Sequence, residues 1–400
     1  MIFFRMLFSV KSMYVLCGLL LAGILNTSAL AQGAGGIVYT DIQVTTMGTR
    51  QQAELAFEVI RLTGAGQPQQ FEVFRQLLDP QTGKLLAEER QNLANMQVNR
   101  VNNTFYTSFE LNPFAVPEAT LKVTIKDLLS QESTTVETAV AKPNPQVDFA
   151  LRNLQACCQS NFVVKGDSIM MQGDSEDQIF LLRFNDSFFP APPPMGNDYA
   201  ASSPVLNIDS VLLLNTGQVF TLQQKGLYFA QKDTTSALGL GFRVTESDYP
   251  KFKKVENVAK SMIYISSDEE IQAMLQADNK KAVLDQFWLN AGGSVENASR
   301  LIRTYYQRVA YANQNFTNYK EGWKTDRGIV YIVFGRPDEV NRLQSGERWV
   351  YRETGGRKAV AFDFMKRTNI FTGQHYELVR SPRYRRIWND AVEMWRKGEI

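Results

Sequence analysis

The sequence predicts a multi-domain protein in which two β-sandwich modules of immunoglobulin-like type precede an α+β domain with a small antiparallel sheet. Three observations support this prediction. The chain has 400 residues, which is more than one hydrophobic core usually supports. Apolar and polar residues alternate in short runs as far as residue 245. Helical spacing replaces this alternation after residue 264.

Residues 1–31 have the pattern of a secretory signal peptide. Arg5 and Lys11 precede an apolar run from residue 13 to residue 25, and small residues follow as far as Ala31. A basic start, a short apolar core and an Ala-x-Ala site are typical of a cleaved leader. The run is also too short to span a bilayer comfortably. We therefore expect an exported protein of the periplasm or cell envelope, without a transmembrane segment after cleavage.

The cysteines predict neither lipidation nor a metal site. Cys17 lies inside the apolar run and follows Leu16, whereas a lipidated cysteine needs a small residue before it. Cys157 and Cys158 are adjacent, and a bond between neighbours would close only a strained ring. We expect buried free thiols, with a strained redox-active pair as the alternative. Two adjacent thiols without further Cys or His nearby are a poor zinc site.

The charge balance argues against a nucleic-acid partner. The chain has 43 Lys and Arg against 41 Asp and Glu, and the leader contains two of the basic residues and no acid. The mature chain would therefore carry no net charge, unlike a typical nucleic-acid binder. Residues 341–400 hold thirteen basic and seven acidic side chains, which predicts a solvated basic face. A polyanion or an acidic partner surface is the alternative.

Residues 36–142 are predicted to form the first β-sandwich. Leu55 and Phe57 share one face of a strand, and residues 121–126 alternate between apolar and polar. The run at 79–83 supplies the proline and glycine of a hairpin loop. Half-buried strands at this spacing are typical of an immunoglobulin-like sandwich, and the strand order stays open.

A second β-rich domain is predicted over residues 146–250, after a stiff connector at 142–145. Strand-like runs occur at 161–171, 178–185, 211–214, 218–231 and 238–245. Residues 189–194 contain four prolines and cannot be a central strand, so we expect a surface loop that continues to about residue 204. The Gly239-Leu240-Gly241 run lacks the third glycine and the following helix of a nucleotide-binding loop.

Residues 255–400 are predicted to form the α+β domain. Ser267 and Glu270 make a capping box, and Ser294 can cap a longer helix after a Gly-Gly break. Strand-like runs follow at 329–334, 348–351, 359–364 and 375–379, and the chain closes on an amphipathic helix with Trp388, Val392 and Trp395. Helices packed on a small antiparallel sheet are an α+β arrangement.

The most specific segment of the chain is the run Gly322-Trp323-Lys324-Thr325-Asp326-Arg327-Gly328. As a structural element, Trp323 would be a buried anchor and the two glycines would take positive φ. Thr325 and Asp326 would bond backbone amides within the turn, and residues 337–339 would start a short helix. As a functional element, Lys324, Asp326 and Arg327 would line a cleft.

Several classes of site are excluded or disfavoured. His375 is the only histidine, so a His-rich metal site is impossible, and we expect a satisfied or exposed histidine in a strand. The sequence contains no nucleophile elbow, P-loop, EF-hand loop or CxxC motif. We therefore assign no catalytic residue, no metal and no cofactor.

The segment from Gly322 to Asp326 resembles the GWxTD-domain proteins, and Arg327, Gly328, Tyr331, Gly335 and Pro337 fit the usual continuation. The resemblance covers about residues 255–400, including the helical segment 305–313 and the strand 349–351. It implies an exported envelope protein of Bacteroidota-like bacteria, often with β-rich segments before the domain. It implies no known biochemical function, so no catalytic residue is carried over.

These observations predict a non-enzymatic binding or scaffolding role for the C-terminal domain, with an envelope protein or glycan as partner. The alternative is a hydrolase or transferase that acts on envelope glycan or peptide through Lys324, Asp326 and Arg327. A deep pocket around these side chains would favour the enzyme. A buried Trp323 in a filled turn would favour the scaffold.

Overall fold

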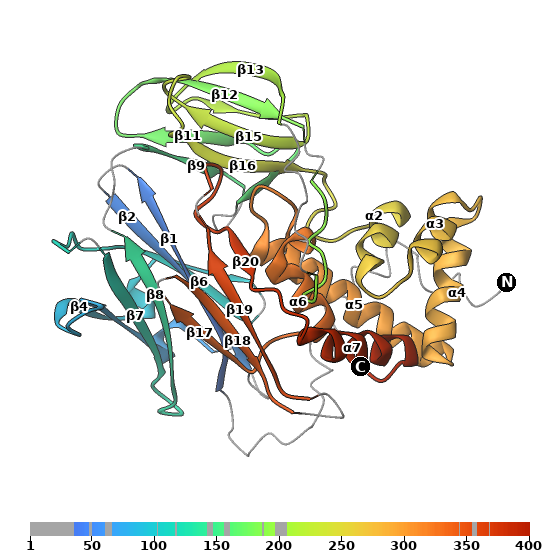
Figure 1. Ribbon diagram of the computed structural model, residues 1–400. Coiled ribbons are helices and arrows are strands. Elements are labelled where there is room, and N and C mark those ends of the chain that lie inside the picture. Colours follow the sequence, from blue (N-terminus) through green and yellow to red (C-terminus); the bar gives the residue numbers. More distant parts are fainter. Residues whose placement is uncertain are drawn as a thin grey trace.

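The computed structural model describes residues 36–47, 50–60, 66–101, 103–116, 118–141, 147–155, 161–185, 188–196, 206–343, 345–353, 358–367 and 369–400. Figure 1 shows two β-sheet units and a C-terminal part in which helices lie against another sheet. The predicted signal peptide, the connector at 142–145 and the Cys157–Cys158 pair lie outside the described residues. Within the described ranges, no helix is both long and apolar enough to cross a membrane.

The first unit consists of two four-stranded antiparallel sheets over one core, with the orders β1-β2-β6-β5 and β4-β3-β7-β8. In the core, the ring centroids of Phe57, Phe71 and Phe105 lie 5.2 to 5.3 Å apart. A sheet-rich N-terminal unit is thereby confirmed, and its immunoglobulin-like type stays a prediction. The elements are β1 (Gly36–Met47), β2 (Arg50–Ile60), η2 (Pro68–Gln70), β3 (Phe71–Leu78), β4 (Leu85–Asn92), η3 (Leu93–Asn95), β5 (Val98–Val101), β6 (Thr104–Glu110), β7 (Glu118–Asp127) and β8 (Ser133–Ala141).

The second unit also has two sheets over one core, with the orders β10-β16-β15-β12-β13 and β14-β11-β9. All pairings are antiparallel except β10 with β16, which is parallel. The strands are β9 (Phe149–Asn153), β10 (Phe162–Val164), β11 (Ile169–Gly173), β12 (Gln178–Phe184), β13 (Ile208–Asn215), β14 (Val219–Phe220), β15 (Gly226–Gln231) and β16 (Leu240–Thr245).

The C-terminal part covers the second face of this five-stranded sheet at β12 and β15. Leu227 and Phe229 of β15 form a small core with Phe371, which lies between β19 and β20. A side chain at Gly241 would place its Cβ 2.2 Å from the carbonyl oxygen of Phe371, so the close approach of this loop requires glycine. All six residues of β15 are buried, as expected of a strand covered on both faces.

The C-terminal part packs helices on the antiparallel sheet β17-β18-β19-β20, which in Figure 1 lies between the first unit and the helices. The predicted α+β arrangement is confirmed. The capping box at Ser267 and Glu270 and the Ser294 cap are present as predicted. The elements are α2 (Val255–Lys260), η4 (Ser261–Tyr264), α3 (Asp268–Gln276), α4 (Lys280–Gly292), α5 (Val295–Phe316), η5 (Gly322–Lys324), α6 (Asp326–Phe334), β17 (Glu339–Leu343), β18 (Gly346–Tyr351), β19 (Val360–Lys366), β20 (Tyr376–Leu378) and α7 (Tyr384–Lys397).

Helix α6 occupies the run for which the sequence predicted a strand, so that prediction is wrong. Every residue of α6 except Tyr331 is buried. Such a short apolar run does not distinguish a buried helix from a buried strand by its pattern alone. The prediction of a helical turn at residues 337–339 is also wrong, because Glu339 begins β17 and pairs with Val350 of β18.

The proline-rich segment at residues 188–194, called the proline loop below, contains no strand, as its prolines predicted. Its placement on the surface was wrong. Ala191 is 2% exposed and belongs to the main C-terminal core. Its N–H donates to the carbonyl oxygen of Lys324 at 2.9 Å, and the carbonyl oxygen of Pro194 accepts from the N–H of Ser381 at 3.0 Å. The proline loop therefore docks onto the turn and onto the chain after β20.

Candidate functional site

The turn at residues 322–328 is fixed first by the end of α5. The fully buried Asn313 accepts the N–H of Trp323 on its Oδ1 at 3.0 Å and donates from its Nδ2 to Pro250 at 3.0 Å. Thr317, which follows the helix, accepts the N–H of Gly322 on its Oγ1 at 3.0 Å. These polar side chains satisfy backbone groups that would otherwise be buried without partners.

Both glycines of the turn are required by close contact, and not by the positive φ that the sequence predicted. Neither residue has φ above zero. A Cβ at Gly322 would lie 1.9 Å from the carbonyl oxygen of Ala312, and a Cβ at Gly328 would lie 1.9 Å from that of Gly322. Thr325 closes the turn as predicted: its Oγ1 accepts the N–H of Gly328 at 3.0 Å and donates to Gly322 O at 2.7 Å.

Trp323 is buried, as predicted, with 5% of its surface exposed. Its ring meets the edges of Phe252 and Tyr264 at centroid distances of 6.5 Å. The Tyr264 hydroxyl donates to the carbonyl oxygen of Trp323 at 3.2 Å. The indole therefore anchors the turn against the segment around α2 and η4.

Asp326 bonds a distant strand and not the turn, which corrects the sequence-based expectation. Its Oδ2 accepts the N–H of Leu378 in β20 at 3.0 Å, and Arg380 forms a two-point ion pair with its carboxylate. Arg380 also donates to the carbonyl oxygen of Pro192 in the proline loop at 3.1 Å. One carboxylate thus ties α6 to β20 and, through Arg380, to the proline loop.

Lys324 and Arg327 each hold a different acidic partner. The Lys324 Nζ lies 2.8 Å from the Glu321 carboxylate. The Arg327 guanidinium lies 3.6 Å from the Glu347 carboxylate, 4.2 Å from the ring centroid of Tyr376 and 5.1 Å from that of Phe316. The three charged residues of the motif are therefore each paired with a residue outside it.

Sequence reasoning missed further charged residues around the turn. We define the charge cluster as Arg243, Lys320, Glu321, Lys324, Asp326, His375 and Arg380. Burial alone would raise the pKa of Glu321, but Arg243 and Lys324 outweigh it and lower that pKa to about 2. Burial lowers the pKa of Lys320 to about 8, although Asp326 opposes the shift. Lys320 and Glu321 directly precede the motif, whereas nothing in the sequence links Arg243 or Arg380 to it.

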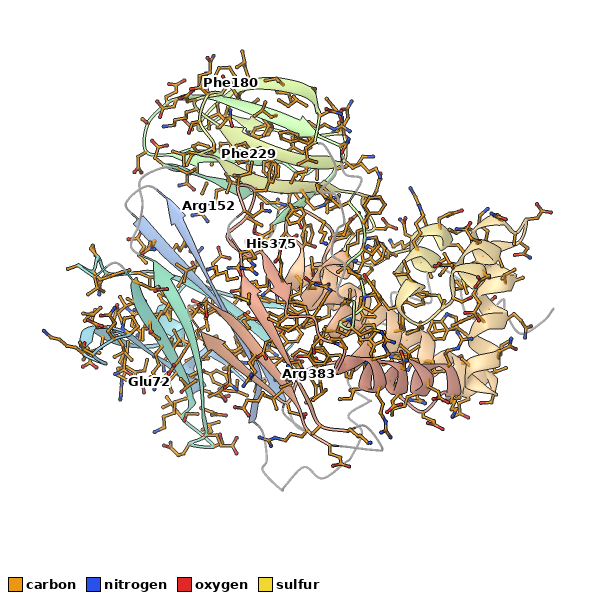
Figure 2. All side chains as sticks on the ribbon, in the orientation of Figure 1. Glu72, Arg152, Phe180, Phe229, His375 and Arg383 are labelled. Atoms are coloured by element: carbon orange, nitrogen blue, oxygen red, sulfur yellow. The ribbon has the colours of Figure 1, made fainter. Side chains whose placement is uncertain are left out.

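His375 lies directly before β20, where this strand meets the second β-sheet unit (Figure 2). Its side chain is 14% exposed, and its Nε2 lies 3.4 Å from the Glu377 carboxylate. Its ring is 5.2 Å from that of Tyr319. Burial lowers the pKa of His375, although Glu377 opposes this, so the imidazole is neutral at pH 7. Its Nδ1 has no hydrogen-bond partner among the described residues.

A comparison with known protein families identifies the domain that contains this turn. The sequence model of the GWxTD domain matches residues 226–397. The chain is a GWxTD-domain protein. No curated protein matches it. The matched range begins earlier than the predicted start at residue 255, because it includes β15 and β16.

β16 lies in the part of the matched range before residue 255, and it packs against the segment around the GWxTD turn. Arg243 of β16 is 1% exposed and donates to the carbonyl oxygen of Tyr319 at 2.8 Å, and its guanidinium lies 3.7 Å from Glu321. β16 therefore contributes directly to the surroundings of the GWxTD turn. The strands of the second unit and the motif form one packed structure.

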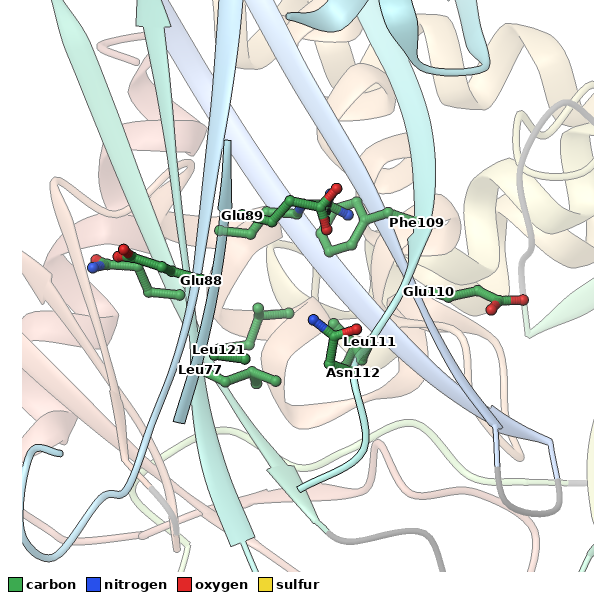
Figure 3. Close-up of a pocket in the computed structure, with 11 residues that line it drawn as sticks. Leu77, Glu88, Glu89, Phe109, Glu110, Leu111, Asn112 and Leu121 are labelled. Atoms are coloured by element: carbon green, nitrogen blue, oxygen red, sulfur yellow. Dashed lines mark ion pairs between the residues drawn. The ribbon is translucent and has the colours of Figure 1, made fainter. Parts of the chain in front are cut away.

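Two hollows among the described residues lie away from the GWxTD turn. One of about 20 Å³ lies in the first unit, with Leu77 and Leu121 on one side and Phe109 and Leu111 on the other (Figure 3). Such a volume holds roughly one water molecule. The other, of about 310 Å³, is lined by Arg348, Val360, Ala361, Asp363, Arg383, Tyr384 and Ile387. Among the described residues, no group of three or more His, Cys, Asp or Glu could hold a metal ion.

Proposed function

We propose that this GWxTD-domain protein is an exported cell-envelope protein that uses its own edge strand β13 to bind another envelope protein. A strand of the partner would pair with β13. The exposure of β13 carries this proposal. Ile208, Val211, Leu212 and Leu213 are 54, 49, 43 and 58% exposed. Within the described part of the chain, β13 pairs with β12 on one side and has no strand on the other. Exposed apolar edge strands are rare because they promote association.

The chemistry of β13 favours a polypeptide over a glycan. The free side of an edge strand presents alternating N–H and C=O groups, which another extended backbone can continue and a glycan cannot. The exposed side chains are aliphatic, and the charged residue Asp209 is already paired with Arg183 at 3.0 Å. The matching occupant is an extended segment with aliphatic side chains on a partner protein.

The GWxTD turn supports a scaffolding role in this proposal. Each of its charged side chains is paired with a residue outside the turn, Trp323 is buried, and the proline loop is hydrogen-bonded to it. These contacts join β20, α6 and the second unit. The turn would thereby hold the five-stranded sheet rigid and keep β13 available. The hydrolase or transferase alternative finds no comparable support in the contacts around Asp326.

Cross-linking in the native envelope tests the proposal. A photo-reactive residue replaces Leu213, and the same residue replaces Leu129 as a control, because Leu129 is 66% exposed and follows β7 in the first unit. We expect a discrete cross-link to a second envelope protein from position 213 only. A cross-link only to another copy of this chain would show that β13 mediates self-association and does not bind a partner protein. An intact mass that retains residues 1–31 would contradict export.

Reconstitution separates a specific complex from chance capture. The cross-linked partner is purified, and its affinity is compared for the unmodified chain, Leu213→Lys and Leu129→Lys. We expect Leu213→Lys to weaken binding by at least tenfold, because it places a charge in the centre of an apolar contact. Leu129→Lys should bind as the unmodified chain does. Equal binding by all three proteins would overturn the assignment of β13.

A further inference from the structure

The larger hollow lies where the first turn of α7 meets the strands β18 and β19. Its volume is about 310 Å³. A water molecule takes up about 30 Å³ in the liquid, so the hollow has room for a small organic molecule or for one side chain of a partner. Figure 2 labels Arg383, which lines the hollow directly before α7. The lining combines charged groups with aliphatic surface, as ligand sites commonly do.

One wall of the hollow is an ion pair between neighbouring strands. Arg348 of β18 and Asp363 of β19 are directly opposite each other in the antiparallel register, so their side chains share one face of the sheet. Arg348 donates from Nε and Nη2 to the two carboxylate oxygens at 2.6 and 3.0 Å. These bonds lower the pKa of Asp363, so its carboxylate is ionised at neutral pH. The wall is therefore held in place and has no net charge.

Arg383 adds a second guanidinium group, whose position is fixed by Tyr384. Its Nη2 donates to the Tyr384 hydroxyl at 2.7 Å, and that hydroxyl donates to the carbonyl oxygen of Ala361 at 3.1 Å. The guanidinium also lies 4.8 Å from the centroid of the Tyr384 ring. Its carboxylate neighbour, Asp363 at 3.8 Å, already accepts from Arg348. Within the described part of the chain, the Nε and Nη1 groups of Arg383 donate no hydrogen bond, so donors remain for a ligand.

The charge of the lining and its aliphatic surface define the ligand. Two guanidinium groups and one carboxylate line the hollow, which gives it one net positive charge. A carboxylate balances this charge and accepts hydrogen bonds from a guanidinium in a favourable planar geometry. Phosphate carries more than one negative charge at neutral pH, and Asp363 would repel it more strongly. Val360, Ala361 and Ile387 add aliphatic surface that a purely polar anion would leave uncovered.

We propose that this hollow binds a small aliphatic carboxylate, with its charged group on Arg383 and its aliphatic body against Ala361 and Ile387. Arg348 neutralises Asp363 and so prevents that carboxylate from repelling the ligand. The ligand is either a free aliphatic acid or the C-terminal residue of a polypeptide, since both present the same chemistry. The hollow belongs to the C-terminal sheet and β13 to the second unit, so either proposal can fail without the other.

Calorimetric titration of the full chain tests this inference at constant ionic strength maintained with chloride. The probes are isovalerate, the peptide N-acetyl-Ala-Ala-Leu, the same peptide with a C-terminal amide, and inorganic phosphate. We expect saturable binding of at least one of the two carboxylates and none of the amide. Tighter binding of isovalerate identifies a free acid as the ligand, and tighter binding of the peptide identifies a polypeptide C-terminus. Tighter binding of phosphate than of either carboxylate would overturn the proposed ligand class.

Three variants locate the bound carboxylate. Arg383→Gln removes the charge of a side chain that is 61% exposed, so it should fold normally and weaken binding by about tenfold or more. Ala361→Leu places a larger side chain in the hollow and should weaken binding to a similar extent without a change of charge. Arg386→Gln is the matched control, because it removes the same charge from α7 at a position that does not line the hollow. Its affinity should equal that of the unmodified chain.

NMR of isoleucine δ1 methyl groups separates the hollow from the apolar surface of β13. Ile387 lines the hollow, whereas Ile208 in β13 is 54% exposed and offers an aliphatic acid a nonspecific contact. We expect the probe to shift the Ile387 signal and to leave the Ile208 signal in place. The proposal is overturned if neither carboxylate binds saturably, if Arg383→Gln or Ala361→Leu binds as tightly as the unmodified chain, or if Ile208 shifts and Ile387 does not.

Discussion

At the scale of single residues, the GWxTD turn is specified by steric contact more than by backbone torsion. Gly328 lies inside helix α6, where glycine is normally unfavourable by about 1 kcal/mol relative to alanine. Its lack of a side chain allows the Gly322 carbonyl to approach to within 1.9 Å of where a Cβ would stand. Gly322 allows the same kind of approach by the Ala312 carbonyl. The two glycines thus allow the backbone of the turn to contact the backbones of α5 and α6 directly.

This contact determines whether replacing Gly328 by alanine stabilises or destabilises the protein. Helix propensity alone predicts that Gly328→Ala stabilises the protein by about 1 kcal/mol. The contact predicts the opposite, a loss of about 1–3 kcal/mol, because a backbone carbonyl must move. Gly373→Ala is the control, since nothing lies within 4 Å of its Cβ position, and should change stability by less than about 0.5 kcal/mol. Urea unfolding measures both, and a stabilised Gly328→Ala would refute the steric explanation.

Glu321 makes stability depend on pH. Its pKa is lowered to about 2 in the folded protein from an ordinary value of 4.5, so the unfolded chain binds the proton more readily. Its contribution of about 3 kcal/mol is fully present above pH 4.5 and is lost as the pH falls toward 2. Urea unfolding between pH 2 and 6 should show this fall in the free energy of unfolding as the pH is lowered. The fall should be smaller in Glu321→Gln. Glu393→Gln on the exposed face of α7 should retain it.

At the scale of elements, α6 shows how capping overrides a strand-like pattern. Residues 329–334 are rich in β-branched and aromatic side chains, which favour strands. The helix begins because Thr325 caps it and ends at Gly335, which has a φ of +82°. Both signals were visible in the sequence, but their spacing of ten residues also fits a strand between two turns.

Thr325→Val tests the role of the cap while preserving the shape of the side chain. It removes the bonds to Gly328 N and Gly322 O, both of them buried, and should cost about 2 kcal/mol. Thr304→Val is the matched control inside α5, where the hydroxyl only bonds back to the Arg300 carbonyl at 3.0 Å. That change should cost less than about 0.5 kcal/mol. Equal losses in chemical unfolding would show that the Thr325 hydroxyl has no special role.

The elements that the sequence could predict are those encoded locally. Strands such as β2, β7 and β12 and the Ser267 and Ser294 caps follow from residues only a few positions apart. The ion pair between Asp326 and Arg380 joins residues 54 positions apart. The proline loop reaches the turn from more than 130 positions away. No local pattern encodes such contacts, so the motif was identified correctly while most of its partners were missed.

At the scale of the whole molecule, the family match and the packing have different boundaries. The match begins at Gly226, the first residue of β15. β15 nevertheless pairs with β12 on one side and β16 on the other, and β12 precedes the match. The proline loop, which covers the GWxTD turn, also precedes it. The matched range therefore lacks a strand and a loop on which its own core depends.

The physical folding unit should accordingly be residues 147–400 and not 226–397. The longer fragment keeps both sheets of the second unit, the proline loop and every element from β15 to α7. The shorter fragment exposes the apolar edge of β15 and removes the Pro192 carbonyl from Arg380. We expect cooperative thermal unfolding for 147–400, near the transition of the full chain. For 226–397 we expect no cooperative transition, or aggregation. Circular dichroism and NMR spectra of both fragments make the comparison. Cooperative unfolding of the fragment 226–397 at the same midpoint would place the folding boundary at Gly226 instead.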